Sequence, residues 1–238
     1  MEIKDLCSLL RASNTDMNCI GYLPDDEQHL HELVRAQEST LNNHMSVISL
    51  EALLRDNERG FSRQQRHKIA SIVASSMLQL QNTPWLAQKF GKQDVLFYKQ
   101  GSTIHSDYPF IRHSFTSSKS SQANATHRTS PTARYLARDS LSNLGIVLLE
   151  ICYGQVIEDQ PIRTKYLTNG MPHEFTNFMT ARDWAETVSE QEPEWEHVIR
   201  CCISCMFEEK ADWENKKFTA AVYESVVEPL EKMVLKWT

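Results

Sequence analysis

One stretch of the chain, between residues 138 and 154, is apolar on nearly every side of a helix. Its aliphatic side chains surround the helix axis instead of following one stripe: Leu141, Leu144, Ile146, Val147, Leu148, Leu149 and Ile151. Such a helix is stable in water only when other elements cover it on all sides. Gly154 follows the last turn, where a glycine commonly ends a helix. The sequence therefore predicts a central, buried helix.

Other helices are expected around this one. Ser49 is placed to cap a short helix with Leu50, Leu53 and Leu54, and Ser62 to cap a long amphipathic helix that ends before Pro84. The long helix should pack beside the central helix, with an open pocket at their edge. The remaining helices are predicted at 3–12, after Asp25 with Leu30, Leu33 and Val34 on one face, and at 178–190, 195–207 and 218–237.

Strands are expected to be few, since only seven of 238 residues are glycine. Two short strands at 94–98 and 108–111 should flank a polar turn, and another short strand could lie at 19–23. Residues 37–45 are predicted to form a loop. Residues 113–131, which are rich in Ser, Thr, Asn and Lys, should form a second, mobile loop. The fold class is therefore mainly α.

Charge and composition exclude several classes of function. The formal net charge of −6 argues against a broad nucleic-acid-binding face. The chain contains no apolar run long enough to span a membrane and no signal-peptide core at its start. We therefore expect a cytoplasmic or nuclear protein with reduced cysteines, no membrane contact and no nucleic-acid partner.

Cys201, Cys202 and Cys205, with His197 one turn earlier, form the most suggestive cluster for metal binding. On a helix, residues 197, 201 and 205 share a face, whereas Cys202 points elsewhere. A closed zinc site takes four ligands, and no second pair of this kind occurs in the sequence. We interpret these residues as buried structural thiols and keep a metal or redox site as the alternative; no metal ligand or cofactor is predicted.

Basic side chains offer the candidate contact surfaces. A cluster at the start of the long helix, which includes His67, is either a solvated face or a patch for an anion or a protein partner. The polar loop and the residues that follow it carry further positive charge. The candidate binding residues are Arg63, Arg66, Lys68, Lys119, Arg128 and Arg134.

Several strings occur in a fixed order from Ser49 onward. They are 49–54, the Thr-Pro-Trp-Leu string at 83–86, Asp-Val-Leu-Phe at 94–97, and the buried segment 140–150. This order resembles the C-terminal lobe of a protein kinase, and best the divergent kinase-like domains of filamentous fungi, which are often fused to signalling or cell-death modules. The resemblance implies a kinase C-lobe-like helical domain at 49–238 with a small β-hairpin, preceded at 1–48 by a reduced N-terminal lobe or a helical extension.

The departures from the kinase pattern imply a degenerate site. The resemblance puts Lys89 at the catalytic aspartate, Gly91 at the loop lysine, and His113 near the magnesium-binding Asp-Phe-Gly. Asp94, at the metal-binding Asn position, is the one carboxylate that remains. Phosphoryl transfer needs positioned Mg²⁺ and a carboxylate that orients the hydroxyl, and one carboxylate cannot serve both. No catalytic residue is therefore predicted.

Three hypotheses follow from these features. The first is a pseudokinase-like, non-catalytic regulatory domain in fungal signalling, which binds a protein partner or a fused signalling domain and takes no small-molecule substrate. The second is an unconventional nucleotide-binding or phosphotransferase enzyme that uses Asp94 with Lys89, Lys92 or His113. The third is an all-helical adaptor, without the hairpin, whose likeness to kinases is accidental.

Overall fold

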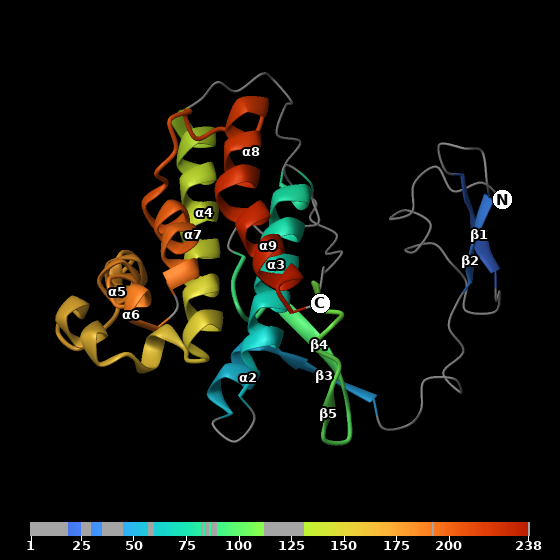
Figure 1. Ribbon diagram of the computed structural model, residues 1–238, viewed down its shortest axis with the longest axis horizontal. Coiled ribbons are helices and arrows are strands. Elements are labelled where there is room, and N and C mark those ends of the chain that lie inside the picture. The colour runs from blue at the N-terminus through green and yellow to red at the C-terminus, as the bar shows by residue number, and fades with distance from the viewer. Residues whose placement is uncertain are drawn as a thin grey trace.

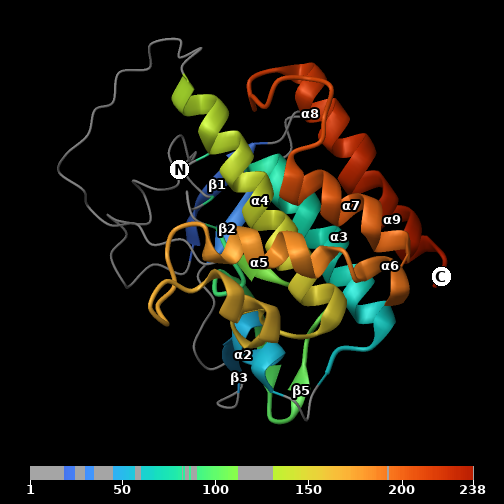
Figure 2. The same ribbon diagram turned by 90° about the vertical axis from the view of Figure 1, so that its left-hand side faces the viewer.

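The structure is a computed structural model that describes residues 19–24, 30–34, 45–56, 60–81, 83, 86, 90–111, 131–191 and 193–237. This part of the chain is mainly helical and carries a small antiparallel sheet, so the predicted fold class is confirmed at this level. Figures 1 and 2 show helices α4, α7, α3 and α9 side by side, with the sheet at one end of α3. The predicted helix at 3–12 lies outside the described residues, as does the loop predicted at 113–131 except for Pro131, which begins α4.

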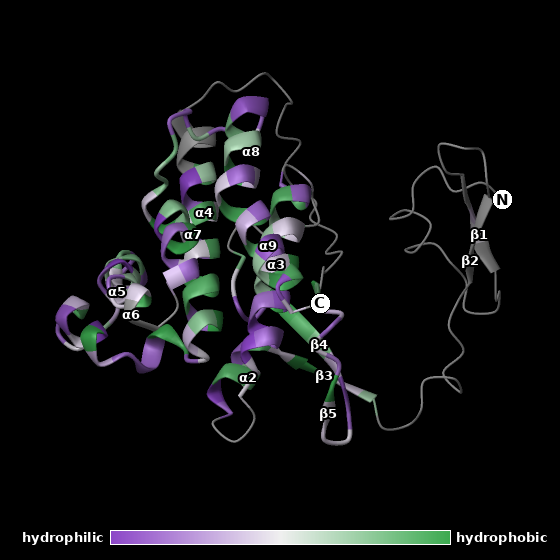
Figure 3. Cartoon of the chain, in the orientation of Figure 1, coloured by the Kyte–Doolittle hydropathy of each residue, from purple (hydrophilic) through white to green (hydrophobic). Residues whose placement is uncertain are grey.

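Helix α4 (Pro131–Tyr153) is the buried helix that the sequence predicts, and Figure 3 shows hydrophobic residues along its C-terminal turns. It packs against α3 (Arg63–Leu80) and, most extensively, α7 (Pro193–Ser204). It begins seven residues before Arg138, because proline, with its fixed φ and no amide hydrogen, fits the first turn of a helix. At its other end Gly154 has φ +66°, and the Gln155 amide donates to the Glu150 carbonyl, so the predicted glycine cap is confirmed.

Two serines begin the N-terminal helices as predicted. Ser49 accepts a hydrogen bond from the amide of Ala52 at the start of α2 (Leu50–Arg55). Ser62 accepts from the amide of Gln65, whose side chain accepts in return from the Ser62 amide, which completes a capping box at the start of α3. Both boundaries are therefore fixed by local hydrogen bonds.

The sheet is larger than the predicted hairpin. β4 (Val95–Gln100) pairs with β6 (Phe110–Ile111), as expected for the two segments around the polar turn. It also pairs with β5 (Thr103–Ile104), a short strand inside the segment that was predicted to be the turn. It also pairs with β3 (Met45–Ser49), where a loop had been expected to extend to residue 45. β3 contains Ser46 and Ser49, which weaken the strand pattern, and it forms because β4 supplies its hydrogen-bond partners.

The predicted helix after Asp25 is wrong. Residues Leu30–Val34 form strand β2, which pairs with β1 (Cys19–Pro24) in a separate two-stranded sheet, and the predicted strand at 19–23 is confirmed. Tyr22 lies opposite Glu32 in this antiparallel register. A segment of five residues is too short for periodicity to distinguish helix from strand, so pairing with β1 decides its conformation.

The C-terminal half is mainly helical, as predicted, with one isolated bridge between Thr168 and Met171, and its helices are shorter than expected. After two 3₁₀ segments, η1 (Ile157–Asp159) and η2 (Pro161–Tyr166), come α5 (Thr176–Ala185) and α6 (Val188–Gln191). The predicted helix at 218–237 consists of α8 (Lys216–Val222), a π-helical turn η3 (Tyr223–Val227) and α9 (Glu228–Leu235). Within the described ranges, no helix combines the length and hydropathy needed to cross a bilayer.

Candidate functional site

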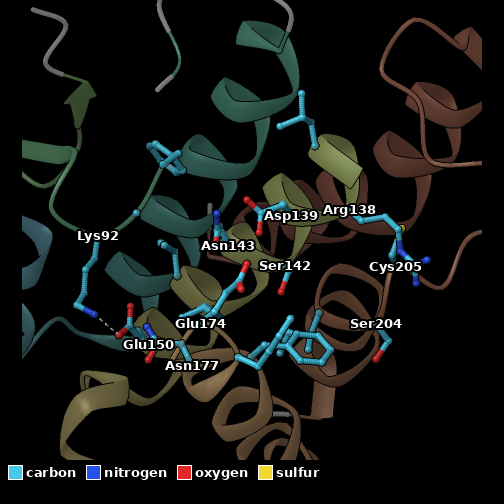
Figure 4. A pocket seen from close by; sticks show the side chains of 18 of the residues that line it. Lys92, Arg138, Asp139, Ser142, Asn143, Glu150, Glu174, Asn177, Ser204 and Cys205 are labelled. Atoms are coloured by element: carbon cyan, nitrogen blue, oxygen red, sulfur yellow. Dashed lines mark hydrogen bonds and ion pairs between the residues drawn. The ribbon is translucent and has the colours of Figure 1, made fainter. Parts of the chain in front are cut away.

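A cluster of three charged side chains, two of them buried and the third at the surface, lies where the end of α4 meets η1. Lys92, in the turn before β4, places its Nζ 2.7 Å from Glu150 Oε1 and 2.8 Å from Glu158 Oε2. Lys92 is 7% exposed and Glu150 1% exposed, and the Ile157 amide also donates to Glu150 Oε1, at 2.8 Å. Figure 4 shows the ion pair of Lys92 and Glu150. We call these three residues the charged triad.

Burial and ion pairing together set the pKa values of the three residues of the charged triad. Burial raises the pKa of Glu150 to about 7, although Lys92 and the Ile157 amide oppose the shift. For Lys92, burial lowers the pKa, but the ion pairs with Glu150 and Glu158 outweigh it and raise the pKa overall. Hydrogen bonding and the charge of Lys92 outweigh partial burial at Glu158 and lower the pKa of that carboxyl. Lys92 therefore stays protonated, because its two carboxylate partners stabilise the charged form.

Asp94 has a structural role in the turn. Its Oδ2 accepts a hydrogen bond from the Gly91 amide at 2.9 Å and one from Gln93 Nε2 at 3.1 Å. The Asp94 amide donates in return to the Gly91 carbonyl at 3.0 Å. Within the described ranges, no ion pair joins Asp94 to Lys92, whose ammonium group binds the two glutamates. Lys89 and His113, the other positions of the degenerate kinase site, lie outside these ranges.

An open cleft of about 930 Å³ runs along α4 and has the charged triad in its lining. Figure 4 shows Asp139, Asn143 and Glu174 extending into this hollow. The pocket was predicted at the shared edge of the central and long helices, whereas this cleft runs along α4 and is otherwise bounded by segments other than α3. They are the loop before β4, η1, the first turn of α5 with the residues before it, and the end of α7: Phe90, Gly91, Lys92, Gln93, Glu158, Glu174, Phe175, Asn177, Phe178, Ile203, Ser204 and Cys205.

The predicted basic cluster is largely bound within the fold. Arg66 donates to the Cys152 carbonyl, and Lys68 Nζ lies 2.7 Å from Asp107 Oδ1. Arg63 lies over the ring of Trp237, 6.0 Å from its centre, and the Trp237 indole donates to His67. The contacts of Trp237 with Arg63 and His67 attach the residues after α9 to α3.

The side-chain contacts do not test the other three candidate basic residues. Lys119 and Arg128 lie outside the described residues, and Arg134 is described through its backbone alone, in the first turns of α4. Their role as contact residues stays a prediction.

The thiols of α7 are part of the core. Cys201 and Cys202 are buried, burial raises the pKa of both, and the Cys201 Sγ lies 3.5 Å from His197 Nε2. Cys205 follows the helix with φ +50°, so it leaves the face shared by 197 and 201. In the part of the chain that the structure describes, no three His, Cys, Asp or Glu side chains are arranged to hold a metal ion.

The charged triad is a feature that sequence reasoning missed, although one signal was present. Glu150 is a charged residue inside the apolar segment of α4, and a buried charge requires a partner. The partner is 58 residues away in the sequence, so the pattern could indicate that one exists but could not identify it.

Comparison with known families gives one match. The model of a domain of unknown function, DUF7580, matches residues 1–237. The chain therefore belongs to this family. No curated protein matches the chain.

Proposed function

We propose that this chain is a non-catalytic, kinase-like domain that acts by binding another protein. The supporting observation is that the polar groups in the turn before β4 are used within the fold. Asp94, the one carboxylate at a kinase metal-binding position, holds the amide of Gly91, and Lys92 is neutralised by two glutamates.

This arrangement is poorly suited to phosphoryl transfer. A transferred phosphoryl group needs a metal ion held by carboxylates, a cation that contacts the phosphate oxygens and a group that orients the nucleophile. A lysine already bound to Glu150 and Glu158 would have to give up buried ion pairs to reach a phosphate. Asp94 would similarly have to release the turn to bind a metal ion.

The cleft supports a binding role. Its volume of about 930 Å³ suits an extended peptide segment, and apolar side chains lie at its border. Phe175, in its lining, is 56% exposed, and Met206, next to the lining residue Cys205, is 64% exposed. Large exposed apolar side chains beside a concave surface are typical of protein-binding sites.

The biological context of the proposal comes from the kinase resemblance. It comprises a regulatory role in fungal signalling and a protein partner or a fused signalling domain. The proposed cytoplasmic or nuclear location comes from the sequence features described above. The third hypothesis, an adaptor without the hairpin, does not fit the pairing of β4 with β5 and β6.

A phosphoryl-transfer assay tests the proposal against the enzyme alternative. The wild-type chain and Asp94→Ala are incubated with γ-labelled ATP, Mg²⁺ or Mn²⁺ and a generic protein substrate. Alanine has no side-chain oxygen, so it can neither bind a metal ion nor accept from the Gly91 amide, and circular dichroism checks that the variant is folded. We expect equal, background incorporation from both chains. Turnover by the wild type that a folded Asp94→Ala chain abolishes, while Asp107→Asn retains it, would overturn the proposal.

A further inference from the structure

The buried carboxylate of Glu150 has one unused oxygen. Oε1 accepts from Lys92 and from the Ile157 amide, whereas Oε2 is buried and finds no hydrogen-bond donor among the described residues. An unsatisfied buried acceptor costs free energy, and the cost is larger when the group is charged. Because Glu150 lines the cleft, a ligand there could supply the missing donor.

The charge of the lining indicates which donor fits. The lining contains four carboxylates and two cations: Asp139, Glu150, Glu158 and Glu174 against Lys92 and Arg138. One of the cations, Lys92, is already bound by two of the carboxylates. Figure 4 shows that Asp139 and Glu174 extend into the same hollow as Glu150. An anionic ligand would be repelled there, whereas a cationic ligand would be attracted.

The walls of the cleft require a second property of the ligand. Apolar surface comes from α4 through Ile146 and Val147, from α5 and the residue before it through Phe178 and Phe175, and from α7 through Ile203. Aromatic and aliphatic side chains of this kind bind a bulky apolar residue by excluding water from both surfaces. A metal ion alone would leave this surface unused.

We propose that the cleft binds a segment of another protein that carries an arginine or lysine next to a bulky apolar residue. The cation donates to Glu150 Oε2, and the apolar side chain packs against Phe175 and Phe178. This inference rests on the proposed function and specifies the chemistry of the partner.

The interaction also predicts a proton linkage. Lys92 and Glu158 act directly on Glu150, and the other charged groups in the lining of the cleft are Asp139, Arg138 and Glu174. A bound cation favours the ionised carboxylate, so binding should release a proton near neutral pH. Affinity should therefore rise between pH 6 and pH 8, a dependence that a purely structural Glu150 would not give.

A selection from random 12-residue displayed peptides on the full chain tests the inference. We expect enriched peptides to place Arg or Lys within two residues of Phe, Leu, Met or Trp. The best peptide, and a copy with its cation replaced by glutamine, are then titrated by fluorescence anisotropy. Glu150→Gln should weaken binding at least about tenfold and remove its pH dependence. Asp139→Asn, a milder change in a partly exposed side chain, should weaken it about two- to fivefold.

Glu228→Gln provides the matched control, because it removes one carboxylate charge from an ion pair on α9, outside the cleft lining. It should leave the affinity unchanged. The inference is wrong if no peptide is enriched, if neutral or acidic peptides bind equally well, or if Glu150→Gln and Asp139→Asn both bind like the wild type. The ATP-turnover assay decides the proposed function independently, since it does not depend on the charge of the cleft.

Discussion

Replacing Gly145 by alanine should separate the two helices at the centre of the fold. An alanine Cβ at this position would lie 2.7 Å from Ile203 Cγ1, 2.9 Å from Cys202 Cβ and 2.9 Å from the backbone nitrogen of Ile203. Normal carbon–carbon contacts are about 3.5–4.0 Å, so α4 and α7 would have to move apart by about 1 Å. The backbone contact cannot be relieved by a side-chain rotation.

The two opposing contributions can be compared in magnitude. Alanine in a helix interior gains up to about 1 kcal/mol over glycine, whereas overpacking a core costs about 1–3 kcal/mol and here also forces α7 away from α4. We expect the free energy of unfolding to fall by about 1–3 kcal/mol, measured by urea denaturation followed by circular dichroism. Gly60→Ala is the control, because nothing lies within 4 Å of its Cβ. A Gly145→Ala chain as stable as the wild type would refute this account of the packing.

The charged triad and the helix caps give three more predictions. Because burial raises the pKa of Glu150 to about 7, above its usual 4.5, its stabilising contribution is complete below pH 4.5 and lost as pH rises through 7. Urea titrations should therefore show about 3 kcal/mol less stability at pH 8 than at pH 4.5, relative to the same difference in Glu150→Gln. Lys92→Met leaves Glu150 and Glu158 without their cation and should lower the free energy of unfolding by about 3 kcal/mol at pH 8 and by less at pH 5. An equal loss at both pH values would contradict the raised pKa of Glu150. Ser62→Ala removes the acceptor for the Gln65 amide and should lower the unfolding free energy by about 1 kcal/mol, with no loss indicating that the capping box is not formed in solution.

Features set by neighbouring residues could be predicted from the sequence. The aliphatic residues that surround α4 require burial whatever covers them, and all are buried except Ile146, which is partly buried and lines the cleft. Ser49 and Ser62 cap their helices through hydrogen bonds that span three residues, so the helix starts could be located without knowledge of the fold.

Features set by distant partners could not be predicted. The segment around Leu33 has helical spacing, yet it forms a strand because β1 pairs with it. β3 depends in the same way on β4, whose Tyr98 lies opposite Val47 across 51 residues of sequence. The cleft is similar, because its lining comes from five separate parts of the chain. In each case the deciding contact is made in the tertiary structure.

The role of Asp94 and Lys92 as structural groups is tested most directly by titration with nucleotide. ATP with Mg²⁺, and separately with Mn²⁺, is added to the wild-type chain while its melting temperature is followed. A ligand that binds only the folded state stabilises it by RT ln(1 + [L]/Kd), so binding raises the melting temperature progressively as the nucleotide concentration exceeds Kd. The account predicts no shift with either metal. A concentration-dependent rise that Asp94→Ala removes and Asp107→Asn retains would contradict it.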